Sequence, residues 1–349
     1  MRQAPGDVRE EKKEESAGSP GSRTTDPLGI LATQAALLAA ANTGMLDLLS
    51  RQPGTPAECA AALGLDARAA EYVLEVLAVS GLATRSGSGY QISIRMQTGS
   101  EVSGSSIALL QRHFAHTEHL LRTGEPLPFM DDSVQQRESS YSALAGDLAR
   151  LAAAAAARLQ AQLQAQLPLA PLRILDVGCG SGIWSLTLAA HARRATVTGL
   201  DLPRVLESFV AQARSLGLSE RIELLAGDMY ELALPQGFFD LALIANVVRL
   251  ESSANARQLI ARVAAAVQPG GWLVVVDAIA GGSAEKEWNR AIYALHLGLR
   301  TRIGGVHSAP TIRAWMREAG LTAVTELDLG VTPGALGALI GQRPKTPGP

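Results

Sequence analysis

Apolar residues in the second half of the chain occur in short runs that are separated by helical patterns. The runs are RILDVGC, ATVTGLDL, RIELLAGD, FFDLALIANVV and GWLVVVDAI. Strands this apolar, with helices between them, are typical of a parallel sheet that is covered on both faces. Two more helices follow, and TAVTELDLG and ALGALIGQR then predict a closing β pair. The pattern therefore predicts an α/β fold with a seven-stranded, mostly parallel sheet.

The first part of the chain predicts a smaller helical domain that ends in a hairpin. Helical periodicity between residues 25 and 96 is broken by turn residues, and Thr55 and Asp66 are the expected N-caps of two helices. The segment ATRSGSGYQIS predicts two short strands around a glycine-rich turn. Helices followed by such a hairpin are typical of a winged helix. Acidic residues outnumber the single Arg68 on the third helix, so we expect this domain to pack or dimerise rather than bind DNA.

Between these two domains the sequence predicts further helices. The segments are SSIALLQRHFAHTEHLLRTGEP and the alanine-rich YSALAGDLARLAAAAAARLQAQLQAQL, which is built from strong helix formers. We expect this region to link the domains and to roof the site. The expected organisation is a disordered tail (1–26), a winged-helix dimerisation domain (27–100), a helical linker (101–168), an α/β catalytic domain (169–344) and a short tail (345–349).

Composition narrows the class of protein. The chain of 349 residues is 47% hydrophobic and has a formal net charge of −2, so neither a nucleic acid nor an anionic membrane is an expected partner. Its two cysteines, Cys59 and Cys179, match no metal or redox spacing, which favours a reducing environment. The N-terminal residues lack the apolar segment of a signal peptide. We therefore expect a cytoplasmic location.

A glycine-rich turn follows the first strand of the α/β domain. In LDVGCGSG, Asp176 precedes Gly178, Gly180 and Gly182, and glycines at such a turn let a ligand approach the backbone. Asp201 ends the second strand, where a carboxylate can accept hydrogen bonds from ribose hydroxyls. Two ligands compete for this pattern, a dinucleotide and S-adenosylmethionine.

Charge distinguishes these two ligands. Asp228 ends the third strand, where it can reach an adenine amino group while Met229 packs on the ring. Three carboxylates without a lysine or arginine form a poor site for pyrophosphate, which prefers positive potential. Ile183 also occupies the position of the third glycine in a dinucleotide motif. The loops therefore favour a cationic nucleoside, S-adenosylmethionine.

With these motifs the chain resembles the class I S-adenosylmethionine-dependent methyltransferases, and in particular the small-molecule O-methyltransferases that carry an N-terminal winged-helix dimerisation domain. The segments ILDVGCGSG, GLDLPRV, AGDMYE, PGGWLVVVD, REAGL and RTGEP carry the resemblance, which extends from about Asp26 to Arg343. It implies a Rossmann-like catalytic sheet, a homodimer and a small-molecule substrate. The residues that it assigns to the cofactor are Asp176, Gly178, Gly180, Gly182, Asp201, Leu202, Asp228, Met229, Ala245 and Asn246.

The resemblance fails at the position of the expected base. O-methylating members have a histidine after the fourth strand, which takes a proton from the substrate hydroxyl, and an acid after the fifth strand that orients it. Here Arg249 occupies the position of the histidine and Asp277 that of the acid. Three interpretations remain open: Arg249 forms a structural ion pair with Asp277, it binds an anionic or carbonyl oxygen of the substrate, or the base lies elsewhere.

Histidines on two helices are candidates for a displaced base or for substrate contacts. The segment RHFAHTEH places His113, His116 and His119 at i, i+3 and i+6 on one expected helix, and His296 lies on the helix after the fifth strand. Such a spacing can also bind a metal, but no further ligand is identifiable, so we expect none. The expected substrate-binding residues are His113, His116, Arg249 and Arg302, and the expected catalytic residues are Arg249, His296 and Asp277.

The sequence therefore predicts S-adenosylmethionine-dependent methyl transfer to a small, aromatic or polyketide-like secondary metabolite. O-methylation follows from the family resemblance. C- or N-methylation remains an alternative, because transfer to a carbon, a neutral amine or an ionised oxygen works without a histidine. Two further alternatives are an enzyme of the same fold that retains the cofactor without methylating, and a winged-helix regulator that senses the nucleoside.

Overall fold

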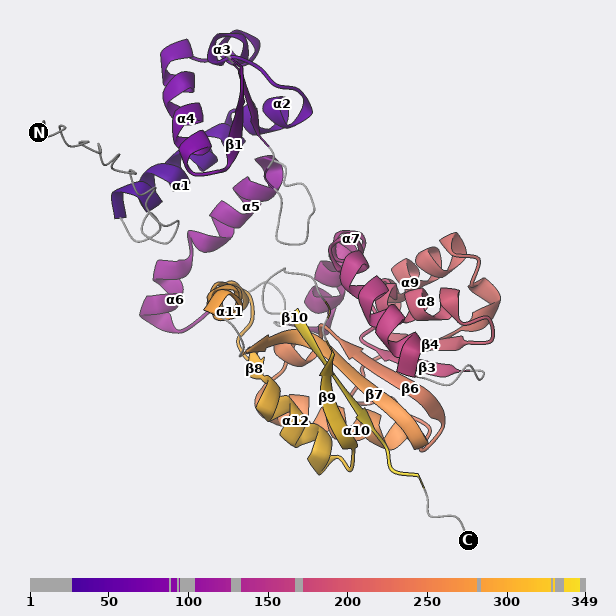
Figure 1. Cartoon of the computed structure of the whole chain (residues 1–349). Coiled ribbons are helices and arrows are strands. Elements are labelled where there is room, and N and C mark those ends of the chain that lie inside the picture. Colours follow the sequence, from indigo (N-terminus) through magenta and orange to yellow (C-terminus); the bar gives the residue numbers. More distant parts are fainter. Residues whose placement is uncertain are drawn as a thin grey trace, which may run out of the picture. The chain divides into compact units, whose positions relative to one another are not determined.

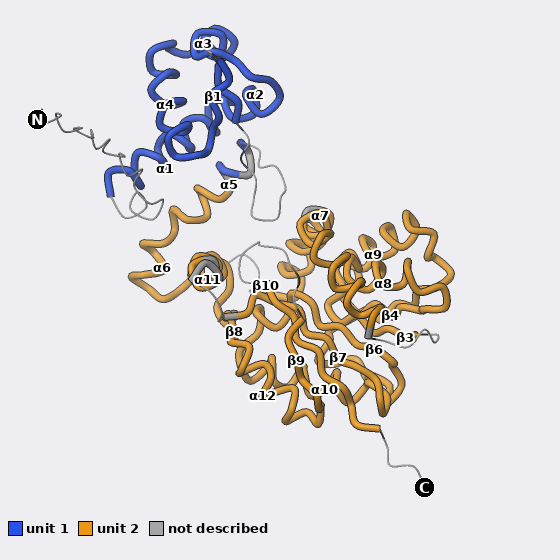
Figure 2. The backbone as a smooth tube through the Cα atoms, viewed as in Figure 1, with its two compact units in different colours: residues 1–94, 103–108 blue, residues 95–102, 109–349 orange. Residues whose placement is uncertain are grey.

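The computed structural model divides into two compact units (Figure 2). It describes residues 27–87, 89–92, 94, 104–126, 133–166, 172–280, 284–327, 329 and 336–345. The first unit takes in the described residues up to Ile94 and the start of helix α5 as far as Ala108, and the second unit takes in those from Leu109 onward. The expected N-terminal tail and residues 346–349 of the expected C-terminal tail lie outside the described residues.

The first unit is built from short helices and an antiparallel hairpin. Its elements are α1 (Pro27–Asn42), α2 (Met45–Arg51), α3 (Pro56–Leu63), α4 (Ala67–Val79), β1 (Ala83–Ser86), β2 (Gly89–Ile92) and the first residues of α5 (Gly104–Phe114). Thr55 begins α3 with a capping box that includes Glu58, and the Asp66 side chain accepts a hydrogen bond from Ala69 N at the start of α4. Both expected N-caps are confirmed.

The core of the first unit lies between its helices and the hairpin. Leu46 and Leu49 of α2 pack with Leu74 and Leu77 of α4 and with Ile92 of β2, and none of these side chains is more than 1% exposed. Among the described residues, no single helix is apolar over a length that would cross a membrane, and α1 and α2 meet that test only as a pair bent by 79°.

The second unit is a sheet between layers of helices (Figure 1). Its helices are the rest of α5, α6 (Thr117–Thr123), α7 (Val134–Gln166), α8 (Ile183–His191), α9 (Pro203–Ser215), α10 (Ser253–Ala266), α11 (Ala284–Gly298) and α12 (Ala309–Glu318), with 3₁₀ turns η2 (Ser219–Arg221) and η3 (Val248–Leu250). Its strands are β3 (Arg173–Val177), β4 (Thr196–Asp201), β5 (Ile222–Ala226), β6 (Phe239–Ala245), β7 (Val267–Ala280), β8 (His307–Ser308), β9 (Thr322–Leu327) and β10 (Leu336–Gln342).

The order of the strands confirms the expected fold class. In the described part of the chain seven strands follow the order β5-β4-β3-β6-β7-β10-β9, and the two-residue β8 pairs with β7. The first five of these seven are mutually parallel, whereas β10 runs antiparallel to both β7 and β9. The strand order reverses between β3 and β6, and α/β sheets bind ligands at the carboxyl ends of strands beside such a point.

Alternating side chains along the strands give each face of the sheet its own core. Ile174 and Val274 pack with α7, α8 and α9, while Leu175 and Val275 pack with α10 and α12. In Figure 1 these two groups of helices lie on opposite sides of the strands. The alanine-rich α7 buries Leu159 completely in the first core. The strand ends are therefore held rigidly between two packed layers.

Candidate active site

A cavity of about 620 Å³ lies at the carboxyl ends of the parallel strands. Its walls are the turns that follow β3, β4, β5 and β6, together with residues of α7 and α11. The volume falls within the range of small-molecule sites. The sequence-predicted residues that line this cavity are Gly178, Gly180, Asp201, Leu202, Asp228, Met229, Ala245, Asn246, Arg249 and His296.

The glycines of the turn after β3 have different surroundings. A Cβ atom on Gly180, which has a φ of 56°, would meet no atom within 4 Å, so a ligand can approach the backbone there. Gly182 is outside the cavity lining and begins α8 with a φ of 73°. A Cβ atom on Gly182 would lie 2.5 Å from Phe209 Cδ2. The structure thus places Gly180 at the cavity and Gly182 in the packing of α8.

Asp201 ends β4 at the cavity and is held by the surrounding backbone. Its Oδ2 atom accepts a hydrogen bond from Gly180 N (2.8 Å), and its Oδ1 atom accepts one from Leu202 N (2.8 Å). Burial raises the pKa of Asp201, although these two backbone donors act in the opposite direction. Each carboxylate oxygen has a second lone pair. The side chain can therefore accept two more hydrogen bonds from ligand hydroxyls.

The turns after β5 and β6 complete this wall. The Asp228 carboxylate accepts a hydrogen bond from Tyr230 N (2.7 Å), and both Asp228 and Met229 line the cavity. Asn246 follows β6 with a positive φ of 63°, which asparagine adopts more readily than most residues. Among the described cavity residues in the turns after β3, β4 and β5, none is lysine or arginine. This wall is consequently acidic.

Asp176 is absent from the cavity lining, in contrast to the expectation from sequence. It is 1% exposed, and its Oδ2 atom accepts a hydrogen bond from Ser185 Oγ of α8 (2.5 Å). Its Oδ1 atom has no hydrogen-bond partner in the described part of the chain. Burial raises the pKa of Asp176 to about 7, against the lowering effect of Ser185. The structure therefore places Asp176 under α8.

Arg249 and Asp277 form the ion pair that was one of the three interpretations. Arg249 Nη1 lies 2.8 Å from Asp277 Oδ1, and the Arg249 backbone N–H donates to Asp277 Oδ2 (3.0 Å). Arg249 also donates to the side-chain oxygen of Asn246. Arg249 lines the cavity, and its Nε atom has no acceptor among the described residues. Arg249 is thus paired with Asp277 at the cavity, while its buried Nε atom is left without an acceptor among the described residues.

His296 of α11 lines the cavity but is a weak base. Burial lowers its pKa to about 3, and the charges of Arg300, His113 and Arg249 act in the same direction. Its Nδ1 atom is buried without a hydrogen-bond partner among the described residues. A general base works best with a pKa near the operating pH. The imidazole is therefore neutral at neutral pH and accepts a proton poorly.

The three histidines of RHFAHTEH do not share one helix, so this expectation was wrong. The helix α5 ends at Phe114 and α6 begins at Thr117, because the backbone turns where His116 N bonds to the carbonyl oxygen of His113 (3.3 Å). His113 packs on His296, with ring centroids 4.5 Å apart, and its Nε2 atom lies 3.1 Å from the His296 carbonyl oxygen. Neither His113 nor His116 lines the cavity.

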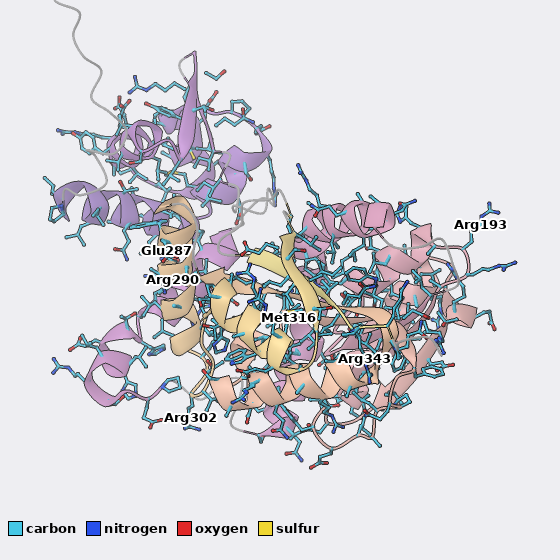
Figure 3. The ribbon with its side chains drawn as sticks, turned by 60° about the horizontal axis from the view of Figure 1, so that its bottom comes forward. Arg193, Glu287, Arg290, Arg302, Met316 and Arg343 are labelled. Atoms are coloured by element: carbon cyan, nitrogen blue, oxygen red, sulfur yellow. The ribbon has the colours of Figure 1, made fainter. Side chains whose placement is uncertain are left out.

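Arg302 also lies away from the cavity lining. Its Nε atom is 3.1 Å from Glu125 Oε2, and its side chain is 50% exposed. Figure 3 shows Arg302 at the outer edge of the ribbon. The structure therefore does not bring Arg302 together with Arg249. Across the described ranges, no group of three or more His, Cys, Asp or Glu side chains is placed to hold a metal ion.

Several cavity residues were missed by the sequence analysis. They include Arg137 and Tyr141 of α7, Glu251 after η3, Tyr293 of α11 and Arg300 just beyond it. Tyr293 lies three residues before His296, near the same face of α11. Helical periodicity counted from His296 was thus a signal that could have identified Tyr293.

Comparisons with known proteins agree with this geometry. Residues 174–271 match the family model described as a methyltransferase domain. An uncharacterized methyltransferase of Mycobacterium bovis is 30% identical over 147 residues, which cover 42% of this chain and 71% of that protein. The crystal structure of the S-adenosylmethionine-dependent methyltransferase SibL is similar with a TM-score of 0.65 and 25% identity, covering 91% of this chain and 98% of that one. The chain belongs to the S-adenosylmethionine-dependent methyltransferases. The family expected from the sequence is confirmed.

Two other curated relatives of this methyltransferase are named as O-methyltransferases. Demethylspheroidene O-methyltransferase of Rhodobacter capsulatus is 28% identical over 201 residues, which cover 58% of this chain and 47% of that protein. The 3-hydroxy-5-methyl-1-naphthoate 3-O-methyltransferase of Streptomyces sahachiroi is 24% identical over 169 residues, which cover 48% of each protein. The chain thus spans about half the length of these two relatives.

Proposed function

We propose that this methyltransferase transfers a methyl group from S-adenosylmethionine to a small aromatic or polyketide-like metabolite, with oxygen as the favoured acceptor. One observation carries the proposal. The carboxylates of Asp201 and Asp228 and the open backbone at Gly180 line the same cavity at the strand ends. The names of two O-methylating relatives support oxygen as the acceptor atom.

The acidic wall of the cavity fits a cationic nucleoside. Asp201 has acceptor capacity for two ribose hydroxyls, and Asp228 can accept from an adenine amino group beside Met229. A wall without lysine or arginine among its described residues suits a ligand without phosphates. S-adenosylmethionine supplies a methyl group on a positively charged sulfur, which is already activated for displacement.

The chain contributes alignment and charge to methyl transfer rather than a strong base. His296 stays neutral because burial lowers its pKa to about 3. Arg249 keeps its charge and can stabilise an acceptor oxygen that is already ionised. Walls that hold the two reactants at reacting distance contribute about 7–11 kcal/mol toward the barrier. The displacement then needs no proton acceptor from the protein.

C- or N-methylation is a second candidate, and the arginine at position 249 is the observation that favours it. A carbon nucleophile or a neutral amine attacks the methyl group without prior removal of a proton by histidine. Incubation with S-adenosylmethionine labelled in its methyl group separates these outcomes, because the linkage of the labelled methyl in the product identifies the acceptor atom. Product that lacks the label would instead support a non-methylating reaction.

We also propose that the protein acts as a homodimer through its first unit and resides in the cytoplasm. Large apolar side chains are exposed on this unit, including Leu31 (63%), Tyr72 (56%) and Val79 (68%). Their burial against a second copy would be favourable. The two cysteines, Cys59 and Cys179, are both free, which is in keeping with a reducing compartment.

Cofactor binding is tested by calorimetric titration with S-adenosylhomocysteine, the demethylated cofactor. Asp201→Ala should weaken binding about ten- to a hundredfold, because charge-assisted hydrogen bonds to the ribose are lost. Asp66→Ala is the matched control, since Asp66 caps α4 in the first unit. Unchanged affinity in a folded Asp201→Ala protein would rule out the ribose assignment.

A further inference from the structure

Two arginines and a tyrosine form a cluster in the cavity wall made by η3 and α11. Arg300 Nη2 donates a hydrogen bond to Tyr293 Oη (2.9 Å). The guanidinium carbon of Arg249 lies 5.3 Å from the centroid of the Tyr293 ring, and that of Arg300 lies 5.9 Å from it. All three side chains line the cavity. Two cations therefore share one aromatic neighbour in the wall of the site.

The carboxylates of the site balance only one of these two cations. Asp277, which is 1% exposed, is the ion-pair partner of Arg249. Glu251 also lines the cavity, but it lies 3.5 Å from Arg137. Among the described residues, no carboxylate lies within ion-pair distance of Arg300. The cluster of Arg249, Asp277 and Arg300 consequently has a net positive charge.

Hydrogen-bond donors of this cluster are also left without acceptors. The Nε atoms of Arg249 and Arg300 are buried, and neither has an acceptor in the described part of the chain. A buried charge without a partner is costly, because water no longer solvates it. The positive potential also acts on His296, whose pKa the charges of Arg300 and Arg249 help to lower. A ligand anion in the cavity would supply the missing negative charge.

We propose that Arg300 and Arg249 together bind a carboxylate group of the acceptor, so that the substrates of this methyltransferase are aromatic carboxylates. The inference rests on the proposed methyl transfer and narrows the acceptor to one chemical class. A guanidinium presents planar paired donors that match the two oxygens of a carboxylate. The cavity lining also includes Phe114, Tyr141 and Trp184, whose rings suit an aromatic acceptor.

Matched anionic and neutral probes test this assignment on the complex with S-adenosylhomocysteine. The probes are benzoate, cinnamate, 1-naphthoate and 3-hydroxy-2-naphthoate, each paired with its primary amide and measured by calorimetric titration. We expect at least one carboxylate to bind about ten- to a hundredfold more tightly than its amide, as is usual for charge-assisted hydrogen bonds. Arg300→Gln should remove this preference.

Arg290→Gln is the matched control on the same helix. Arg290 lies 2.8 Å from Glu287 in an ion pair and is absent from the cavity lining, and Figure 3 shows both side chains on α11. This variant should keep the preference for the carboxylate. Arg300→Gln should keep the wild-type affinity for S-adenosylhomocysteine, which also shows that the variant is folded.

The outcomes distinguish this inference from the proposed function. If wild-type protein binds S-adenosylhomocysteine but no carboxylate of the panel better than its amide, only the inference is overturned. The same holds if Arg300→Gln keeps the preference, or if it loses S-adenosylhomocysteine, which would assign Arg300 to the carboxylate of the cofactor. Wild-type protein that does not bind S-adenosylhomocysteine would overturn the proposed function and the inference together.

Discussion

Asp176→Asn is expected to change how the stability of the second unit depends on pH. Asp176 is 1% exposed, its Oδ2 atom accepts a hydrogen bond from Ser185 Oγ, and its Oδ1 atom has no partner among the described residues. Burial raises its pKa from 3.8 to about 7. Between these values the folded chain holds a proton that the unfolded chain has released.

The direction and size of the effect follow from this difference in pKa. Because the folded-state pKa is raised, the stabilising contribution is fully present below about pH 4 and is lost as the pH rises through about 7. One pKa unit corresponds to about 1.36 kcal/mol of stability. The rise in the pKa of Asp176 from 3.8 to about 7 therefore corresponds to about 4 kcal/mol. Asparagine has nearly the same shape and does not titrate. As the pH rises from about 4 to above 7, the free energy of unfolding of Asp176→Asn minus that of wild type should therefore increase by about 4 kcal/mol.

Tryptophan fluorescence during urea unfolding measures this difference at a series of pH values from about 4 to 8. The tryptophans are suited to the assay because Trp184, Trp272, Trp288 and Trp315 all belong to the second unit. Ser185→Ala provides a second variant, because it removes the hydrogen bond that lowers the pKa of Asp176. The pKa of Asp176 should then be higher, so the free energy of unfolding of Ser185→Ala should keep falling up to a higher pH than that of wild type.

A difference between Asp176→Asn and wild type that stays constant over this pH range would refute the reasoning, since Asp176 would then titrate alike in the folded and unfolded chains. The cofactor provides an independent check. Because Asp176 is absent from the cavity lining, Asp176→Asn should bind S-adenosylhomocysteine as wild type does. Loss of S-adenosylhomocysteine binding in Asp176→Asn would show that Asp176 contributes to the cofactor site.

Two further substitutions test packing and charge near the site. Gly182→Ala should lower the free energy of unfolding by about 2–4 kcal/mol, because φ is 73° and a Cβ atom would lie 2.5 Å from Phe209. Gly217→Ala is the control, since its φ is 67° but a Cβ atom would meet no atom within 4 Å. It should lower the free energy of unfolding by about 1–2 kcal/mol. Equal losses in urea unfolding would contradict the packing argument. Arg249→Met should cost about 3–5 kcal/mol by leaving the buried Asp277 without its partner, and adding Asp277→Asn should restore part of this. A fully stable Arg249→Met protein would contradict that account.

Much of the fold could be predicted because local patterns and packing agree. Ile174 and Leu175 are both apolar and face different cores, which is why β3 is recognisable as a buried strand. Thr55 and Asp66 could be predicted as caps because their side chains accept from backbone N–H groups within the same turn. The break between α5 and α6 could not be predicted, because alanine at position 115 is a strong helix former.

Residues at strand ends could be predicted because a parallel sheet fixes where those ends lie. Asp201 ends β4, while Asp228 and Asn246 follow β5 and β6, and all three line the cavity. Asp176 lies within β3, two residues from Ile174, so it shares the face that packs on α8. The side chain of Asp176 therefore points to α8 and away from the cavity because of its position in β3, and the motif alone did not indicate which face of the strand it occupies.

Residues on helices were harder to predict, because a helix sequence does not fix its rotation about its own axis. Tyr293 lines the cavity because α11 turns that face toward η3, and Arg300 lines it from the turn just beyond the helix. Arg302 is two residues further along and points to solvent, where it pairs with Glu125. Arg302 was thus expected at the site, whereas Arg300 lines the cavity.

Asp277 explains why an acid can be present where its usual histidine partner is absent. It accepts hydrogen bonds from the backbone N–H groups of Arg249 (3.0 Å) and Ala278 (2.7 Å), and neither bond depends on the side chain at position 249. The acid therefore anchors η3 whichever residue follows β6. Asp277 balances the charge of Arg249, and Arg300, which has no carboxylate within ion-pair distance among the described residues, leaves the cavity wall with a net positive charge. We infer that the site stabilises negative charge on the acceptor where a histidine would remove a proton, so that an acceptor already ionised needs only alignment with the methyl group.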